Sequence, residues 1–199
     1  MNQSADILQL ASNQHLLRAA DVRARGWPPQ LLLNLHRSGK LQRVGRGLYS
    51  LPGAEISEHQ TAMEVCQRVP KAVLCLLSAL QFHGIGTQMP HEVWIALPEG
   101  TQTPALDYPA LRIARLRGDA YSEGIETVTS HGVPIRVYSV AKAVADCFKF
   151  RNKIGLDVAL EALKDTWRDR KVTMAELNHF AKINRVERVM QPYLEAVTQ

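Results

Sequence analysis

The chain has 199 residues, a formal net charge of +5 and 46% hydrophobic residues, and its length suits one large domain or two small ones. Its longest apolar run, residues 72–77, is far shorter than the roughly 20 residues that span a bilayer, and no Lys or Arg precedes Arg18 to begin a secretory signal. Cys66, Cys75 and Cys147 lack C-x-x-C spacing and lie in apolar stretches, which indicates buried thiols in a reducing compartment. The sequence therefore argues against membrane and secreted proteins and predicts a cytoplasmic one.

The excess positive charge is confined to the first quarter of the chain. Residues 1–52 contain seven Lys or Arg and two acidic residues, a net charge of +5, whereas residues 53–199 contain 17 of each and are neutral. Such asymmetry predicts a segment that binds a polyanion, joined to a neutral body with another role. Pro52-Gly53 marks the expected boundary, which gives a first domain over residues 1–52 and a second over residues 54–199.

The basic segment predicts three helices followed by a β-hairpin. The helices are expected at residues 5–10, from residue 19 or 20 to Arg25 before Gly26, and from Pro28-Pro29 to about Ser38. Two short strands, residues 41–44 and 48–51, flank the turn Gly45-Arg46-Gly47. Helix, glycine turn, helix and basic hairpin, in that order, are typical of a winged helix-turn-helix.

The third helix is the expected recognition helix, with Gln30, Asn34 and Arg37 on its polar face. Amide and guanidinium groups suit base edges because they can form bidentate hydrogen bonds with adenine or guanine. Four further cations are expected to contact phosphates or the minor groove; they are Arg25, Lys40, Arg43 and Arg46. The alternative is a small helical module for protein contacts, whose arginines are merely solvated.

The remainder of the chain predicts an α+β body. A capping box at residues 57–60 opens a helix, and the apolar residues 72–83 favour a second helix because Gly84 follows them. Strands are expected at residues 92–97, 111–116, 124–129 and 133–138, the last two joined around Ser130-His131-Gly132. Helical periodicity then begins at Ser139 and at Leu156, a T-x-x-E box starts a helix at Thr173, and Pro192 bends or restarts a last one.

Catalytic and metal-binding motifs are largely missing. No phosphate-binding glycine loop or G-x-S-x-G elbow is present, and His83, His91 and His131 have no partners at metal-ligand spacing. Asp169-Arg170-Lys171 is the one triplet of nuclease type, and it falls between predicted helices rather than on a strand. We therefore expect a protein that is not an enzyme and that needs no metal or other cofactor.

A dense charged stretch lies where one predicted helix ends and the next begins. It comprises Asp146, Lys149, Arg151, Asn152 and Lys153. Cations near a helix C-terminus stabilise it, so the stretch could serve as a cap. A binding surface is the alternative reading.

Three separated blocks of sequence carry a resemblance to a known family. They are residues 41–52, residues 78–84, and residues 138–155 followed by 159–163. Together, and from about residue 6 to residue 170, the chain resembles the AbiEi family of abortive-infection antitoxins, which act in phage defence as the regulator half of type IV toxin–antitoxin pairs.

The resemblance implies an N-terminal winged helix that binds inverted repeats upstream of its own operon as a transcriptional repressor. It also implies a C-terminal domain that counteracts a nucleotidyltransferase toxin, with Asp146, Lys149, Arg151 and Lys153 as the candidate antitoxin surface. Whether antagonism needs contact with the toxin, and whether the protein dimerises or binds DNA in paired copies, stay open. The rival functions are a nuclease-like enzyme with a winged-helix targeting module and a module that binds only proteins.

Overall fold

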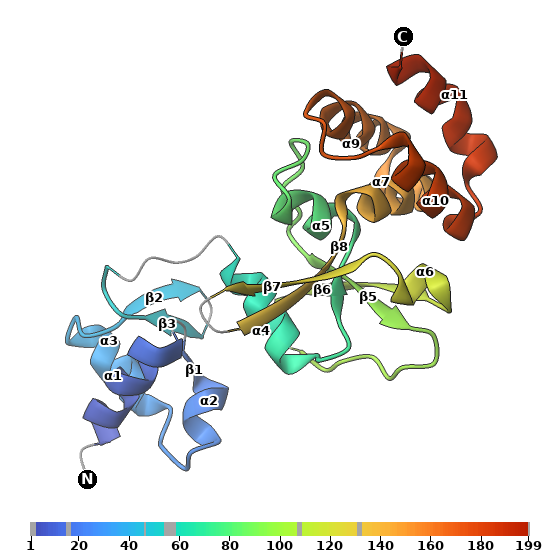
Figure 1. Ribbon diagram of the computed structural model, residues 1–199. Helices are drawn as coiled ribbons and strands as arrows, with labels where there is room; N and C mark the ends of the chain where they lie inside the picture. Colours follow the sequence, from blue (N-terminus) through green and yellow to red (C-terminus); the bar gives the residue numbers. More distant parts are fainter. Residues whose placement is uncertain are drawn as a thin grey trace. The chain divides into compact units, whose positions relative to one another are not determined.

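The computed structural model describes residues 3–14, 17–45, 47–53, 59–106, 109–130 and 133–198. The chain forms two compact units, Met1–Glu58 and His59–Gln199 (Figure 1). Each unit has its own hydrophobic core.

Within its described residues, the first unit contains three helices and a small antiparallel sheet. Its elements are α1 (Gln3–Gln14), β1 (Leu17–Arg18), α2 (Ala19–Arg23), α3 (Gln30–Arg37), β2 (Gln42–Gly45) and β3 (Leu48–Ser50). The strand order is β1-β3-β2. Strand β1 was not predicted, because two residues are too few to show a pattern, and α1 is longer than the expected residues 5–10.

Local contacts explain the boundaries of α2. Arg18 is a poor N-cap residue, but its backbone N–H donates to the Asp21 carboxylate at 2.9 Å, which satisfies one free donor of the first turn. Gly26 has a φ of +73°, a left-handed conformation that favours glycine and ends the helical path. Leu17 and Val22 are fully buried in the core of the first unit.

The second unit contains a five-stranded mixed sheet and eight helices within the part of the chain that is described. Its elements are α4 (Gln60–Arg68), β4 (Val73–Leu74), α5 (Leu76–Phe82), β5 (Val93–Pro98), β6 (Leu111–Leu116), α6 (Asp119–Ser122), β7 (Ile125–Ser130), β8 (Val133–Tyr138), α7 (Val140–Lys149), α8 (Arg151–Ile154), α9 (Leu156–Arg168), α10 (Met174–Asn184) and α11 (Glu187–Val197). The strand order is β6-β5-β4-β8-β7. Pairs β5–β6 and β4–β8 are parallel, and β4–β5 and β7–β8 are antiparallel.

The helix predicted over residues 72–83 was wrong at its N-terminal end. Val73 and Leu74 form the central strand β4, and α5 starts only at Leu76. Both strand residues are almost completely buried, and a strand covered on both faces has a continuous apolar sequence without helical or alternating periodicity.

Two other expectations concern residues at gaps in the described chain. Helix α4 begins at Gln60, whereas Ser57 and Glu58 of the expected capping box lie outside the described residues. His131 and Gly132 of the expected β7–β8 turn lie outside them as well.

Helix α7 is the centre of the helical layer. Residues 141–148 are all buried, and α7 packs against α5, α9, α10 and α11, which gather around it in Figure 1. Its N-terminus is capped by Ser139, whose Oγ accepts from the backbone N–H of Lys142. Helix α10 begins with the predicted box, in which Thr173 Oγ1 accepts from the Glu176 N–H and the Glu176 carboxylate accepts from the Thr173 N–H.

Candidate nucleic-acid interface

The polar residues predicted on the recognition helix share one exposed face of α3. Gln30, Asn34 and Arg37 are separated by four and three residues, a spacing that places side chains on the same side of a helix. All three are exposed, while Leu32 and Leu35 on the opposite side are buried in the core of the first unit. The face therefore presents two amides and one guanidinium to solvent.

The C-terminus of α3 is tied to the start of β2. The backbone N–H groups of Lys40 and Leu41 both donate to the Leu35 carbonyl oxygen, at 2.9 and 3.1 Å. His36 Nδ1 donates to the carbonyl oxygen of Leu41 at 3.1 Å, and its ring lies 6.0 Å from the Tyr49 ring on β3. These contacts hold the polar face of α3 in a fixed position relative to the β2–β3 hairpin.

The flanking cations are exposed where the structure describes them. Arg25 donates from Nη1 to the Asp21 carbonyl oxygen at 3.1 Å, and Lys40 follows α3 directly. Arg43 lies on β2 opposite Tyr49, whereas Arg46 lies outside the described residues. Arg23 on α2 is a further exposed cation that sequence reasoning did not select, although the charge count of this segment already contained it.

The comparisons with known proteins bear directly on this unit. Residues 5–52 match the family model described as transcriptional regulator, AbiEi antitoxin. The predicted resemblance to the AbiEi family is confirmed for this segment. The exposed face of α3 and the hairpin lie within the segment that matches this family model.

The fold of the chain also resembles a solved structure. The crystal structure of RV2827C protein from Mycobacterium tuberculosis matches with a TM-score of 0.59 and 15% identity, over 92% of this chain and 72% of that chain. At this level of identity the likeness concerns the fold alone, a mixed α+β architecture. No curated protein matches the chain.

Beyond residues 5–52, the predicted charged stretch is not a single exposed surface. The prediction was wrong for Asp146, which is only 1% exposed because it faces the interior from the second turn of α7. Its Oδ1 accepts from Lys142 Nζ at 2.5 Å and from Asn184 Nδ2 at 2.7 Å. Burial raises the pKa of this carboxyl, and both donors oppose that rise.

The remaining members of the stretch differ in their surroundings. Arg151 donates from Nη1 to the Phe148 carbonyl oxygen at 2.9 Å and so caps the end of α7. Lys153 is exposed, with Nζ 5.7 Å from the Phe150 ring centroid, and Asn152 is exposed beside it. Lys149 is half-buried.

Three features of the second unit bear on enzyme-type chemistry. Cys66, Cys75 and Cys147 are free and buried, as predicted, and burial raises the pKa of each thiol. In the described ranges, no three His, Cys, Asp or Glu side chains are grouped to hold a metal ion. The Asp169–Lys171 triplet lies between α9 and α10, and no described helix has the length and apolarity needed to cross a membrane.

Proposed function

We propose that this protein is a transcriptional repressor and the antitoxin of a type IV toxin–antitoxin pair. It represses its own operon by binding inverted repeats and counteracts a nucleotidyltransferase toxin. The observation that carries the proposal is the exposed row Gln30, Asn34 and Arg37 on α3, within residues 1–52, which hold the whole excess positive charge. The family match over residues 5–52 supports it.

In this proposal the first unit acts as a winged helix-turn-helix. Helix α3 enters the major groove, where the amides of Gln30 and Asn34 bind adenine and the guanidinium of Arg37 binds guanine. The β2–β3 hairpin is the wing, with Arg43 and Arg46 at phosphates or in the minor groove. Arg25 and Lys40 bind phosphates beside α3 and fix its register without reading bases.

The short length of α3 is the reason why we propose an operator with two half-sites. Helix α3 has eight residues, so at 1.5 Å per residue it is about 12 Å long. Such a helix reads only a few base pairs, and one copy should bind weakly. Two copies on half-sites separated by whole turns, roughly 34–36 Å each, would supply the missing contacts.

The decisive experiment is to footprint the DNA upstream of the gene and then to compare a variant of the recognition helix with variants of the wing. Asn34→Ala should relax specificity and cost on the order of 1–3 kcal/mol against the preferred base only. Arg43→Ala, and equally Arg46→Ala, should weaken binding to all sequences and reduce the log–log salt slope by about 0.9 per lost phosphate contact.

A matched control is available in the second unit. Arg168 is exposed but forms ion pairs with Asp165 at 3.1 Å and Asp169 at 3.0 Å, so Arg168→Ala should leave binding unchanged. Identical behaviour of Asn34→Ala and Arg43→Ala would refute the assignment of α3 as the recognition helix. Metal-dependent cleavage of the DNA by the purified protein would show that the protein is an enzyme and would refute the proposed repressor function.

The antitoxin role requires a separate test in cells that express the cognate toxin. We would reverse the charge of Lys149, Arg151 and Lys153 together in the full chain. Loss of protection with an unchanged melting temperature would support a functional surface. Protection that persists while stability falls by a few tenths to about 1 kcal/mol per residue would assign these cations to helix capping alone.

A further inference from the structure

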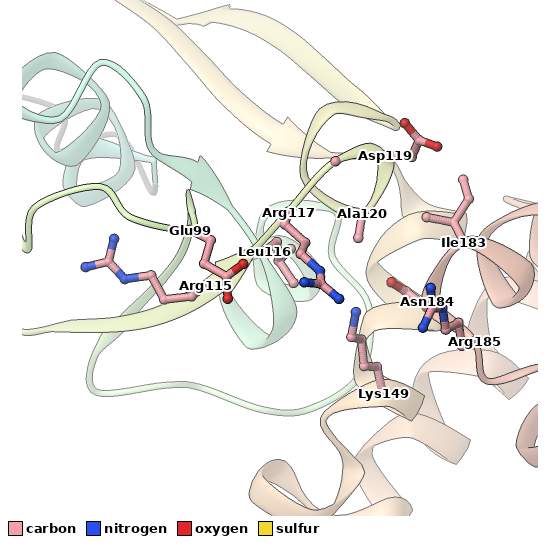
Figure 2. Close-up of a pocket in the computed structure, with 11 residues that line it drawn as sticks. Glu99, Arg115, Leu116, Arg117, Asp119, Ala120, Lys149, Ile183, Asn184 and Arg185 are labelled. Atoms are coloured by element: carbon pink, nitrogen blue, oxygen red, sulfur yellow. The ribbon is translucent and has the colours of Figure 1, made fainter.

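A cavity of about 660 Å³ opens in the second unit where several chain elements end (Figure 2). Parallel strands β5 and β6 end there, at Pro98 and Leu116, as do helices α7 and α10, at Lys149 and Asn184. In open sheets, ligands bind beyond the carboxyl ends of parallel strands. A concavity of this volume suits a small molecule.

Three cations converge on this cavity. Figure 2 shows Arg117 and Lys149 pointing toward one another, with Arg185 across from them. None of the three forms an ion pair with any carboxylate in the described part of the chain. The pKa of Lys149 is lowered chiefly by burial and further by the positive charges of Lys142, Arg185 and Arg117, against the opposing effect of Asp146.

The other charged groups of the cavity do not neutralise these cations. Arg115 is held at the rim by the Thr101 carbonyl oxygen and by Thr103 Oγ1, at 2.5 and 2.9 Å. Asp119 points away from Arg117 and Lys149 in Figure 2, and Glu99 lies between Arg115 and Arg117 in that view but forms no ion pair with either in the described part of the chain. Asp146 is the carboxylate that acts on the pKa of Lys149, but its Oδ1 already accepts from Lys142 and Asn184, so Lys149 forms no ion pair of its own in the described part of the chain.

Asn184 supplies an independent sign of a missing ligand. It lines the cavity, is only 4% exposed, and its Nδ2 donates to Asp146 Oδ1 at 2.7 Å, which fixes the orientation of the amide. Its Oδ1 is buried and has no hydrogen-bond donor in the described structure, and in Figure 2 it lies on the side that faces Lys149. A buried acceptor without a donor is unfavourable, because it has lost its hydrogen bond to water without gaining another.

The backbone at Arg185 is strained. Its φ is +58°, a left-handed conformation that a non-glycine residue adopts at a cost. Lys149 and Arg185 could serve only to stabilise the C-terminal ends of α7 and α10. That explanation does not account for the free acceptor of Asn184. It also does not account for Arg117, which forms no ion pair in the described part of the chain and caps no helix end.

We propose that this cavity binds a nucleoside polyphosphate. Arg117, Lys149 and Arg185 bind the phosphate oxygens, since charge-assisted hydrogen bonds to phosphate are among the strongest available. Asn184 Oδ1 accepts from a hydroxyl or amino group of the nucleoside. Leu116, Ala120 and Ile183 form an apolar wall for the base.

Calorimetric titration of the full chain with ATP, GTP, CTP and UTP, each alone, tests the proposal. At least one nucleotide should bind, and inorganic triphosphate should bind more weakly because it lacks the nucleoside donor for Asn184. Arg117→Ala and Arg185→Ala should each lower the affinity about tenfold or more. Arg168→Ala is the matched control and should bind as the wild type does.

Several results would overturn the proposal. They are the absence of nucleotide binding by the wild type, affinities unchanged in both variants, or equally tight binding of inorganic triphosphate. If instead no nucleotide binds and Arg117→Ala lowers DNA affinity and the salt slope, the cavity belongs to a DNA-contacting surface. Should Arg117→Ala fail to fold by circular dichroism, Arg117→Lys, which keeps the charge but not the fork, serves in its place and should bind nucleotide less tightly.

Discussion

Replacing Lys142 with Met isolates the buried charge pair at the centre of the second unit. Lys142 is completely buried and Asp146 is 1% exposed. The ammonium lies 2.5 Å from Asp146 Oδ1 and 4.3 Å from the Tyr138 ring centroid. Lys142→Met keeps most of the side-chain volume but leaves the carboxylate without its cation, retaining only the amide donor of Asn184.

The expected loss of stability depends on pH in a defined way. Removing one partner of a buried pair costs about 3–5 kcal/mol, unless the remaining carboxyl takes up a proton. Protonation in the folded variant costs about 1.4 kcal/mol per pH unit above an unfolded pKa of about 3.9. Because the pKa of Asp146 is raised in the wild type as well, the added instability starts above that raised pKa, grows by about 1.4 kcal/mol per pH unit and is limited to about 3–5 kcal/mol.

The sign of this dependence follows from proton binding. The folded variant holds a proton on Asp146 that the unfolded chain has released, so its stability falls relative to the wild type as the pH rises above the wild-type pKa of Asp146. Urea unfolding at several pH values measures the difference. A Trp27→Phe background confines the fluorescence signal to the second unit, because only Trp94 and Trp167 of the three tryptophans then remain.

A second variant tests the same reasoning from the other side. Lys142→Met combined with Asp146→Leu replaces the pair by apolar groups and should recover most of the loss, since well-packed apolar replacements of buried ion pairs are often neutral or stabilising. The residual loss reflects the unpaired amide of Asn184. A destabilisation of Lys142→Met that does not change between pH 5 and pH 7 would refute the argument.

Two further predictions concern helix capping and thiol reactivity. Thr173→Ala should cost about 1 kcal/mol in urea unfolding at neutral pH, because it removes the N-cap of α10. The Thr173 hydrogen bonds lower the pKa of Glu176, so the cap's contribution should fade as the pH falls through that pKa, and an equal loss at pH 3 would contradict the role of the carboxylate. Cys75 and Cys147 should react with a thiol reagent only as fast as the chain unfolds, because burial raises the pKa of both; rapid labelling of the native protein would refute this.

Sequence patterns predicted those elements whose local signals agree with their tertiary surroundings. The strands β6 and β8 and the T-x-x-E start of α10 were placed at the correct residues. Their signals are turn residues, alternation and a capping pair, all of which act over a few residues. The polar face of α3 could be read from its helical spacing for the same reason.

The remaining features depend on contacts between distant parts of the chain. Asp146 was assigned to a surface because its neighbours along the chain are charged, yet its partner Asn184 lies 38 residues away. Arg117 and Arg185 are far apart in the sequence and meet only because β6 and α10 end at the same place. No pattern in one sequence reveals such a meeting point.

The shortness of β4 sets how cooperatively the second unit can unfold. This strand pairs through Val73 and Leu74 with β5 on one side, and through Leu74 with β8 on the other. The longer ladders β5–β6 and β7–β8 each run over six residue pairs, so the two halves of the sheet meet at a narrow seam. A cavity-forming substitution such as Leu74→Ala would weaken that seam and let the halves exchange their amide hydrogens as separate units.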